Sequence, residues 1–133
     1  MIVSDLAQLA GTERDVQGEG WRSRRFLRRE DGVNFSLHLT ELDAGAELEL
    51  EYAHHFEANY CISGEGEVVD VAAGRTHQLR PGSMYTLDHH DRHILRTKTP
   101  MTLVCVFWPA LVGNERHNPS GGYEPAEAIQ EEG

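Results

Sequence analysis

The side chains best suited to chemistry fall in two short segments of this sequence. In the first, His54 and His55 precede Glu57, and in the second, Tyr85 is followed by three histidines that end with His93. Imidazole, carboxylate and phenol groups can bind a metal ion, and all-β proteins build metal sites from inward-facing side chains of separate strands. Because each segment lies next to a glycine-marked turn, one end of a barrel could hold both. The pattern indicates a candidate metal site.

Each of these side chains also has an ordinary structural explanation. Residues 88–91 are typical of a polar turn, and His93 begins an apolar strand, where a hydrogen-bonded core histidine fits equally well. Tyr85 alone would be interpreted as packing. Glu57 is the strongest candidate, because a carboxylate inside a barrel costs free energy unless it is paired or binds a cation. Spacing and composition leave both interpretations open.

The elements that must position these residues are short strands. From Phe35 onward, apolar and polar residues alternate with period two, the pattern of half-buried strands. Such segments are 35–40, 46–52, 60–62, 67–71, 77–79, 84–87, 93–95 and 101–108. Glycine- or proline-containing turns separate many of them, which predicts an all-β sandwich or barrel.

The last expected strand, 101–108, is apolar on both faces. One face carries Met101, Leu103, Cys105 and Phe107, and the other carries Val104, Val106 and Trp108. A strand of this kind needs a cover on its outer face, from another sheet, the N-terminal segment or a second subunit. We therefore expect a homodimer.

The chain length predicts one domain. We expect it to cover residues 1–117, with a short N-terminal wrap at 2–20 on the outside of the barrel. Residues 118–133 carry four Glu and no basic residue, a composition typical of a flexible acidic tail.

Composition excludes several kinds of partner. The 133 residues carry a formal net charge of −10, which repels nucleic acids and anionic membranes. No run approaches the ~20 apolar residues of a membrane span, and residues 1–11 lack the pattern of a secretory signal. Cys61 and Cys105 are far apart and lack zinc-motif spacing, so we expect two reduced thiols in a cytoplasmic protein.

Two stretches resemble the motifs of the cupin family, small jelly-roll barrels that usually hold a metal ion. In one, Glu57 is followed by six residues and Gly64, and in the other, 81–82 (Pro-Gly) precedes His93. The first cupin motif normally supplies His-x-His ahead of its Glu. Here the histidines at 54–55 are adjacent, and neighbours on a strand point to opposite faces, so at most one faces inward.

Seven blocks of sequence are closely similar to ectoine synthases, one branch of the cupins. They are 1–3, 11–14, 21–25, 35–38, 60–66, 89–93 and 103–107, and the likeness extends from residue 1 to about Tyr123. The resemblance implies a single-domain cupin barrel and a hydro-lyase that converts N4-acetyl-L-2,4-diaminobutyrate into the compatible solute ectoine with loss of one water.

The resemblance also implies a divalent metal at Glu57, Tyr85 and His93, with iron(II) favoured and zinc or manganese left open. Tyr85 would then replace the absent cupin histidines, and the three side chains would meet around one cation inside the barrel. Three protein ligands leave coordination positions open, as a catalytic metal requires.

A substrate pocket follows from the same resemblance. Its substrate-binding residues fall on Trp21, Arg25, Thr40, Cys105 and Phe107, and its candidate acid and base groups fall on Tyr52, His55, Glu115 and His117. Arg25 would pair with the substrate carboxylate, while Trp21 and Phe107 would exclude water. Position 38, often Asn in the family, is His here, and its role stays open.

Two other functions remain open at this point. A cupin dioxygenase could use the same iron pocket, although it would consume oxygen. A non-catalytic or drifted cupin could keep the barrel and pocket without turnover. The presence of Glu57, Tyr85 and His93 together argues against a non-catalytic cupin, whereas a drifted relative with another amide-bearing substrate stays open.

Overall fold

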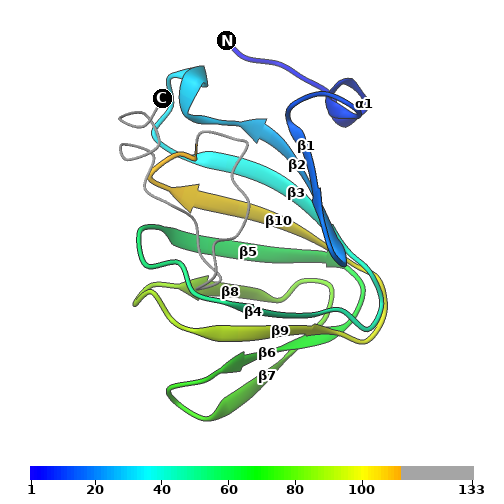
Figure 1. Ribbon diagram of the computed structural model, residues 1–133, viewed down its shortest axis with the longest axis vertical. Helices are drawn as coiled ribbons and strands as arrows, with labels where there is room; N and C mark the ends of the chain where they lie inside the picture. Colours follow the sequence, from blue (N-terminus) through cyan, green and yellow to red (C-terminus); the bar gives the residue numbers. More distant parts are fainter. Residues whose placement is uncertain (112–133) are drawn as a thin grey trace.

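Figure 1 shows the computed structural model, which describes residues 1–111. These residues form ten strands, one short α-helix and one 3-10 turn. In chain order the elements are α1 (Leu6–Leu9), β1 (Asp15–Gly18), β2 (Trp21–Leu27), η1 (Arg29–Asp31), β3 (Ser36–Leu42), β4 (Glu47–Leu50), β5 (Phe56–Ser63), β6 (Gly66–Asp70), β7 (Arg75–Leu79), β8 (Met84–Leu87), β9 (His93–Thr97) and β10 (Met101–Trp108). The prediction of an all-β fold is confirmed.

The strands form two antiparallel sheets. The first has the order β1-β2-β3-β10-β5-β8, and the second has the order β4-β9-β6-β7. In Figure 1 the six-stranded sheet begins at β1 beside α1, and the β6–β7 hairpin lies at the opposite end of the molecule. One hydrophobic core lies between the sheets, and both sheets contribute side chains to it.

Side-chain alternation along β10 decides what enters this core. β10 lies in the middle of the six-stranded sheet, between β3 and β5. Its residues Leu103, Cys105 and Phe107 are buried, whereas Val104 and Val106 are only partly buried and lie on the other face. The expected two-faced strand is therefore present, and its outer face is incompletely covered by residues 1–111.

Strand register lines up one inward-facing row across the six-stranded sheet. Arg25 in β2 lies opposite His38 in β3, which lies opposite Cys105 in β10. Cys105 lies opposite Asn59 in β5, and Asn59 lies opposite Tyr85 in β8. Five strands thus place polar or ionisable groups along one line inside the barrel.

The N-terminal segment differs in detail from a simple wrap. It lies on the outside, but residues 15–18 extend the sheet as the edge strand β1, and β2 follows directly. The hairpin is held by two hydrogen bonds from the Arg22 guanidinium to Asp15, at 2.9 and 2.6 Å. Val16 and Leu9 are buried beneath it.

The predicted tail, 118–133, lies outside the described residues, as does the end of the predicted domain from 112 onward. Between residues 1 and 111 there is no helix with the length and apolar character needed to cross a membrane.

Candidate active site

A cavity inside the barrel brings polar side chains from several strands together. Its polar lining consists of Ser23, His38, Thr40, Tyr52, Glu57, Asn59 and Tyr85. The rest of the lining is largely apolar and includes Trp21, Leu103 and Phe107. The free volume is about 40 Å³, enough for an ion or for about one water molecule.

Glu57 is a buried carboxyl on the inward face of β5, opposite Phe107 of β10. Burial raises the pKa of Glu57 to about 8, and the neighbouring Asn59 amide offsets part of this rise. A carboxylate in such surroundings is unstable unless a positive charge accompanies it. The position therefore favours either a neutral carboxyl or a bound cation.

Tyr85 stands on β8 within reach of Glu57. Burial raises the pKa of the Tyr85 phenol well above 10, and the negative charge of Glu57 raises it further. Without a cation, this side chain is a neutral phenol. A cation between the two oxygens would oppose both causes, because it favours phenolate and carboxylate.

His93, the first residue of β9, has the geometry of a metal ligand. Its Nδ1 lies 2.9 Å from the carbonyl oxygen of Asp91, which can only accept, so Nδ1 carries the proton. The lone pair is then on Nε2, which is buried and has no hydrogen-bond partner among residues 1–111. Burial also lowers the pKa of His93, which keeps the ring neutral. Metal-binding histidines commonly have this arrangement, with one ring nitrogen bound to a carbonyl and the other turned toward the metal.

The three predicted ligands are distributed over two cavities that share Tyr85. Glu57 and Tyr85 line the barrel cavity, whereas Tyr85 and His93 line a neighbouring cavity of about 160 Å³. Tyr85 is common to both, and its ring centroid lies 6.3 Å from that of His93. Tyr85 thus neighbours both other candidates, whereas Glu57 and His93 line different cavities rather than the single hollow that the resemblance implied.

The predicted substrate-binding residues lie mainly around the barrel cavity, which Trp21, Thr40, Cys105 and Phe107 line. Arg25 is fully buried but is not part of the lining. Its Nε donates to the Ser23 hydroxyl at 3.4 Å, and Ser23 itself faces the cavity.

Cys105 has the surroundings of a packing residue rather than a nucleophile. Burial raises the pKa of its thiol far above the usual value, and the charge of Glu57 adds to this effect. Its Sγ donates to Thr40 Oγ1 at 3.5 Å. Reactive cysteines have a lowered pKa, so Cys105 has the character of a packing residue in the cavity wall.

Two of the four candidate acid and base residues, Tyr52 and His55, lie within residues 1–111. The ring of Tyr52 lines the barrel cavity and packs edge-on against Phe107, with centroids 5.2 Å apart. His55 is buried, with its ring centroid 6.2 Å from Phe107, but it does not line the cavity. Glu115 and His117 lie outside the described residues.

His38 is a cavity residue whose role the sequence left open. It is buried in β3, its Nδ1 lies 3.4 Å from the Ser23 hydroxyl, and its Nε2 has no hydrogen-bond partner among residues 1–111. Burial, assisted by the charge of Arg25, lowers the pKa of His38 well below 6.5. No signal in the sequence pointed to this, because alternation with Leu37 and Leu39 predicts that His38 faces solvent. In the structure Ser36 and His38 are buried, whereas Leu37 and Leu39 are only partly buried.

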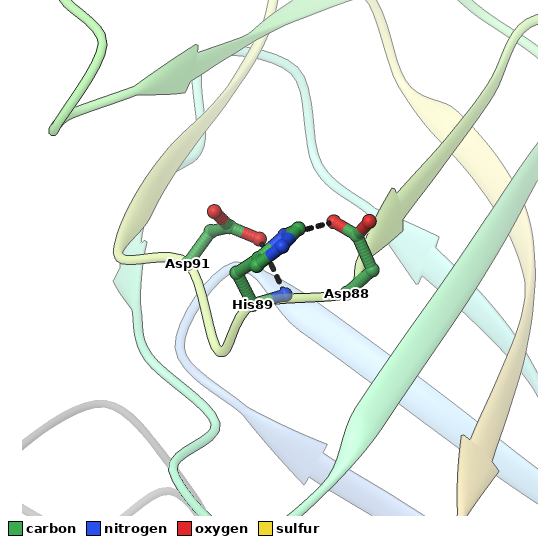
Figure 2. Close-up of side chains that lie close together, drawn as sticks. All are labelled: Asp88, His89 and Asp91. Carbon is green, nitrogen blue, oxygen red and sulfur yellow. Dashed lines mark hydrogen bonds and ion pairs between the residues drawn. The ribbon is translucent and has the colours of Figure 1, made fainter.

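A second group of potential ligands lies on the surface. Figure 2 shows Asp88, His89 and Asp91 close together in the loop after β8. His89 Nδ1 is 3.0 Å from Asp88, and the His89 backbone N–H donates to Asp91 at 3.2 Å. The side chain of His89 is 81% exposed. These interactions account for the cluster as a solvated polar turn, as residues 88–91 suggested.

Comparisons with known proteins identify the family. The family model described as ectoine synthase matches residues 1–127. The L-ectoine synthase of Desulfosudis oleivorans is 47% identical over 128 residues, which are 96% of this chain and 99% of the relative.

Solved structures give the same result for the fold. The ectoine synthase of P. lautus has a TM-score of 0.81 and 43% identity, covering 100% of this chain and 87% of that one. An RmlC-like cupin from Shewanella frigidimarina has a TM-score of 0.60 at 23% identity, over 72% of this chain and 82% of that one, and shares the fold. The cupin-type barrel and the prediction of an enzyme are thereby confirmed. The chain belongs to the ectoine synthase family of hydro-lyases.

Proposed function

We propose that this enzyme converts N4-acetyl-L-2,4-diaminobutyrate into ectoine with the aid of a divalent metal, iron(II) first, at Glu57, Tyr85 and His93. The observation that carries the metal proposal is the buried lone pair of His93 Nε2, next to Tyr85 and, through it, to Glu57. Two oxygen donors and one imidazole suit iron(II), while zinc and manganese accept the same set. When bound, such a metal supplies positive charge that polarises a carbonyl oxygen.

The chain's own residues supply orientation. In the reaction, the α-amine nitrogen bonds to the acetamide carbonyl carbon, the carbon–oxygen bond breaks, and the oxygen leaves as water with two protons from the amine. Holding the chain folded makes this attack intramolecular, which contributes roughly 7–11 kcal/mol to lowering the barrier. The apolar walls at Trp21, Leu103 and Phe107 exclude the water that would reverse the step.

Proton transfer requires an acid or base side chain that faces the cavity. Tyr52 is the described acid or base candidate that lines it. Arg25, through Ser23, supplies fixed positive charge next to this lining, which suits a substrate carboxylate. The substrate needs more room than 40 Å³, so its binding requires lining side chains such as the half-buried Trp21 to move outward.

Anaerobic ring closure by the purified protein tests this proposal. With ferrous iron and N4-acetyl-L-2,4-diaminobutyrate, ectoine should accumulate without oxygen, and Glu57→Gln should reduce turnover at least a hundredfold with an unchanged circular dichroism spectrum. Glu65→Ala, at an exposed carboxylate before β6, is the matched control and should retain activity. Dependence on oxygen would indicate a dioxygenase, and absence of turnover would indicate a non-catalytic or drifted cupin.

We also propose a homodimer that forms through the outer face of β5 and β10. Phe56, Tyr60, Ile62 and Trp108 are large apolar side chains on this face, and each is more than a third exposed. Continuous apolar surface of this kind marks interaction sites in soluble proteins.

We propose a cytoplasmic location and a role in osmotic stress. Cys61 and Cys105 are both free and buried, as expected where thiols stay reduced. The proposed product is a compatible solute, which acts in the compartment where it is made.

A further inference from the structure

His90 links two loops that carry candidate site residues. It lies in the loop between β8 and β9, and its Nδ1 is 2.8 Å from the carbonyl oxygen of Tyr52 and 3.2 Å from that of His55, in the loop between β4 and β5. Both partners only accept hydrogen bonds, so Nδ1 carries a proton and donates to both. One imidazole therefore joins the backbone that presents Tyr52 and His55 to the loop that leads, three residues later, into His93.

Stacking fixes the orientation of the same ring. The His90 imidazole lies on Phe56 with centroids 4.8 Å apart and an angle of 28° between the planes. Phe56 in turn stacks on Trp108 at 5.9 Å. Phe56 directly precedes Glu57, so the contact holds the start of the strand that carries the carboxyl ligand.

The backbone at this position also points to a role for the side chain. His90 has φ of 55°, and it is the one non-glycine residue with positive φ in the part of the chain that the structure describes. Glycine and asparagine adopt this conformation more readily. Backbone strain of this kind persists where the surrounding structure requires it and is common near functional sites.

We propose that His90 is a positioning residue that clamps the β4–β5 loop to the β8–β9 loop and thereby sets the geometry of the active site. The rings of Tyr52 and His55 both pack against Phe107, at 5.2 and 6.2 Å, so displacement of their backbone would shift both rings. The catalytic part of this inference rests on the proposed function, whereas the clamp itself does not.

The test compares His90→Gly with His90→Asn and with the matched control His89→Ala. Gly removes the imidazole but suits the positive φ, so it separates the hydrogen bonds from the backbone conformation. A misplacement of about 1 Å can cost about a hundredfold in rate. We therefore expect kcat to fall tenfold to a hundredfold while KM changes less than threefold. Amide hydrogen exchange in residues 51–56 should accelerate at least tenfold, with little change in the melting temperature.

His90→Asn should recover part of the loss, because Asn accepts the left-handed backbone and its amide can donate to one of the two carbonyls. If His90→Gly does not fold, His90→Asn takes its place. Amide hydrogen exchange in residues 51–56 of that variant should then be faster than in wild type, but less than tenfold faster. His89→Ala, next to it in the same loop and highly exposed, should match wild type within twofold in both measurements.

Two outcomes would overturn the clamp. One is wild-type exchange in residues 51–56 after the imidazole is removed, whatever the activity. The other is a loss of activity and protection that His89→Ala reproduces, because the effect would then belong to the loop as a whole. If the wild-type protein does not convert N4-acetyl-L-2,4-diaminobutyrate into ectoine, the proposed function fails. The hydrogen-exchange experiment still decides whether His90 holds the two loops together.

Discussion

Burial, more than charge pairing, sets the ionisation of the polar side chains inside the barrel. It raises the pKa of Glu57 to about 8 and lowers those of His38 and His93. In the absence of a cation, these three groups therefore favour their neutral forms at pH 7, because a low-dielectric environment disfavours the charged form of each group. A bound divalent metal would reverse this preference for the carboxyl and the phenol beside it.

Tyr85→Phe tests the phenol as a ligand. The substitution keeps the ring and removes one oxygen donor, so bound iron after dialysis should fall at least tenfold while the melting temperature stays the same or rises, since a buried hydroxyl is lost. Metal analysis and thermal unfolding measure the two effects. Tyr60→Phe, which removes an exposed phenol from the neighbouring strand, should leave iron content unchanged. Full iron binding by Tyr85→Phe would remove Tyr85 from the ligand set.

Phe107→Ala tests the shared wall of the site. Phe107 is buried and packs against the rings of His38, Tyr52 and His55, so removing it leaves a cavity. Denaturant unfolding should show a loss of about 3–5 kcal/mol in the free energy of unfolding. Trp108→Ala, at the next position but 52% exposed, should cost less than half as much. Equal losses would contradict the burial pattern of β10.

At the scale of elements, β10 organises the site, because its central place brings β3 and β5 to either side of it. The edge strand β1 pairs with β2 through a backbone ladder, and the ion pair of Asp15 with Arg22 adds a side-chain contact between the two strands. This pair lowers the pKa of Asp15 from 3.8 to about 2, chiefly through the hydrogen bond from Arg22. An ion pair thus adds to the backbone ladder and to buried Val16 in holding the edge strand.

The Asp15–Arg22 pair makes stability depend on pH in a defined window. Because the pKa of Asp15 is lower in the folded protein, its contribution is present above about pH 4 and is lost as pH falls through about 2. After allowance for solvent screening we expect about 1 kcal/mol. Asp15→Asn should lower the free energy of unfolding by about this amount at pH 7 and converge with wild type near pH 2. Asp43→Asn, in an exposed turn, is the control, and a difference that persists unchanged at pH 2 would contradict the assignment.

At the scale of the whole molecule, two sheets enclose one core, and the apolar outer face of β5 and β10 remains for a partner. Sedimentation at micromolar concentration should show a homodimer for wild type. Tyr60→Glu places a charge in the centre of this face and should shift the population to monomer without changing the fold. Glu67→Lys, on the other sheet, should leave the dimer intact. A monomeric wild type would contradict the proposed interface.

Much of this arrangement is already readable in the amino-acid order. Period-two alternation shows that Leu103, Cys105 and Phe107 share one face of their strand, because successive side chains of a strand must point to opposite sides. Family resemblance then assigns ligand roles to Glu57, Tyr85 and His93, and in the structure Tyr85 neighbours each of the other two.

Other features depend on contacts between strands that are distant along the chain. Register places His38 in the same row as Arg25 and Cys105, folding distributes the three ligands over two cavities, and the His90 ring bridges two loops. Alternation is a property of a single strand, whereas register and loop contacts follow from the packing of all the strands together. For that reason, the local pattern showed which residues share a face, and the folded barrel alone decided which face of β3 and of β10 turns inward and which residues meet there.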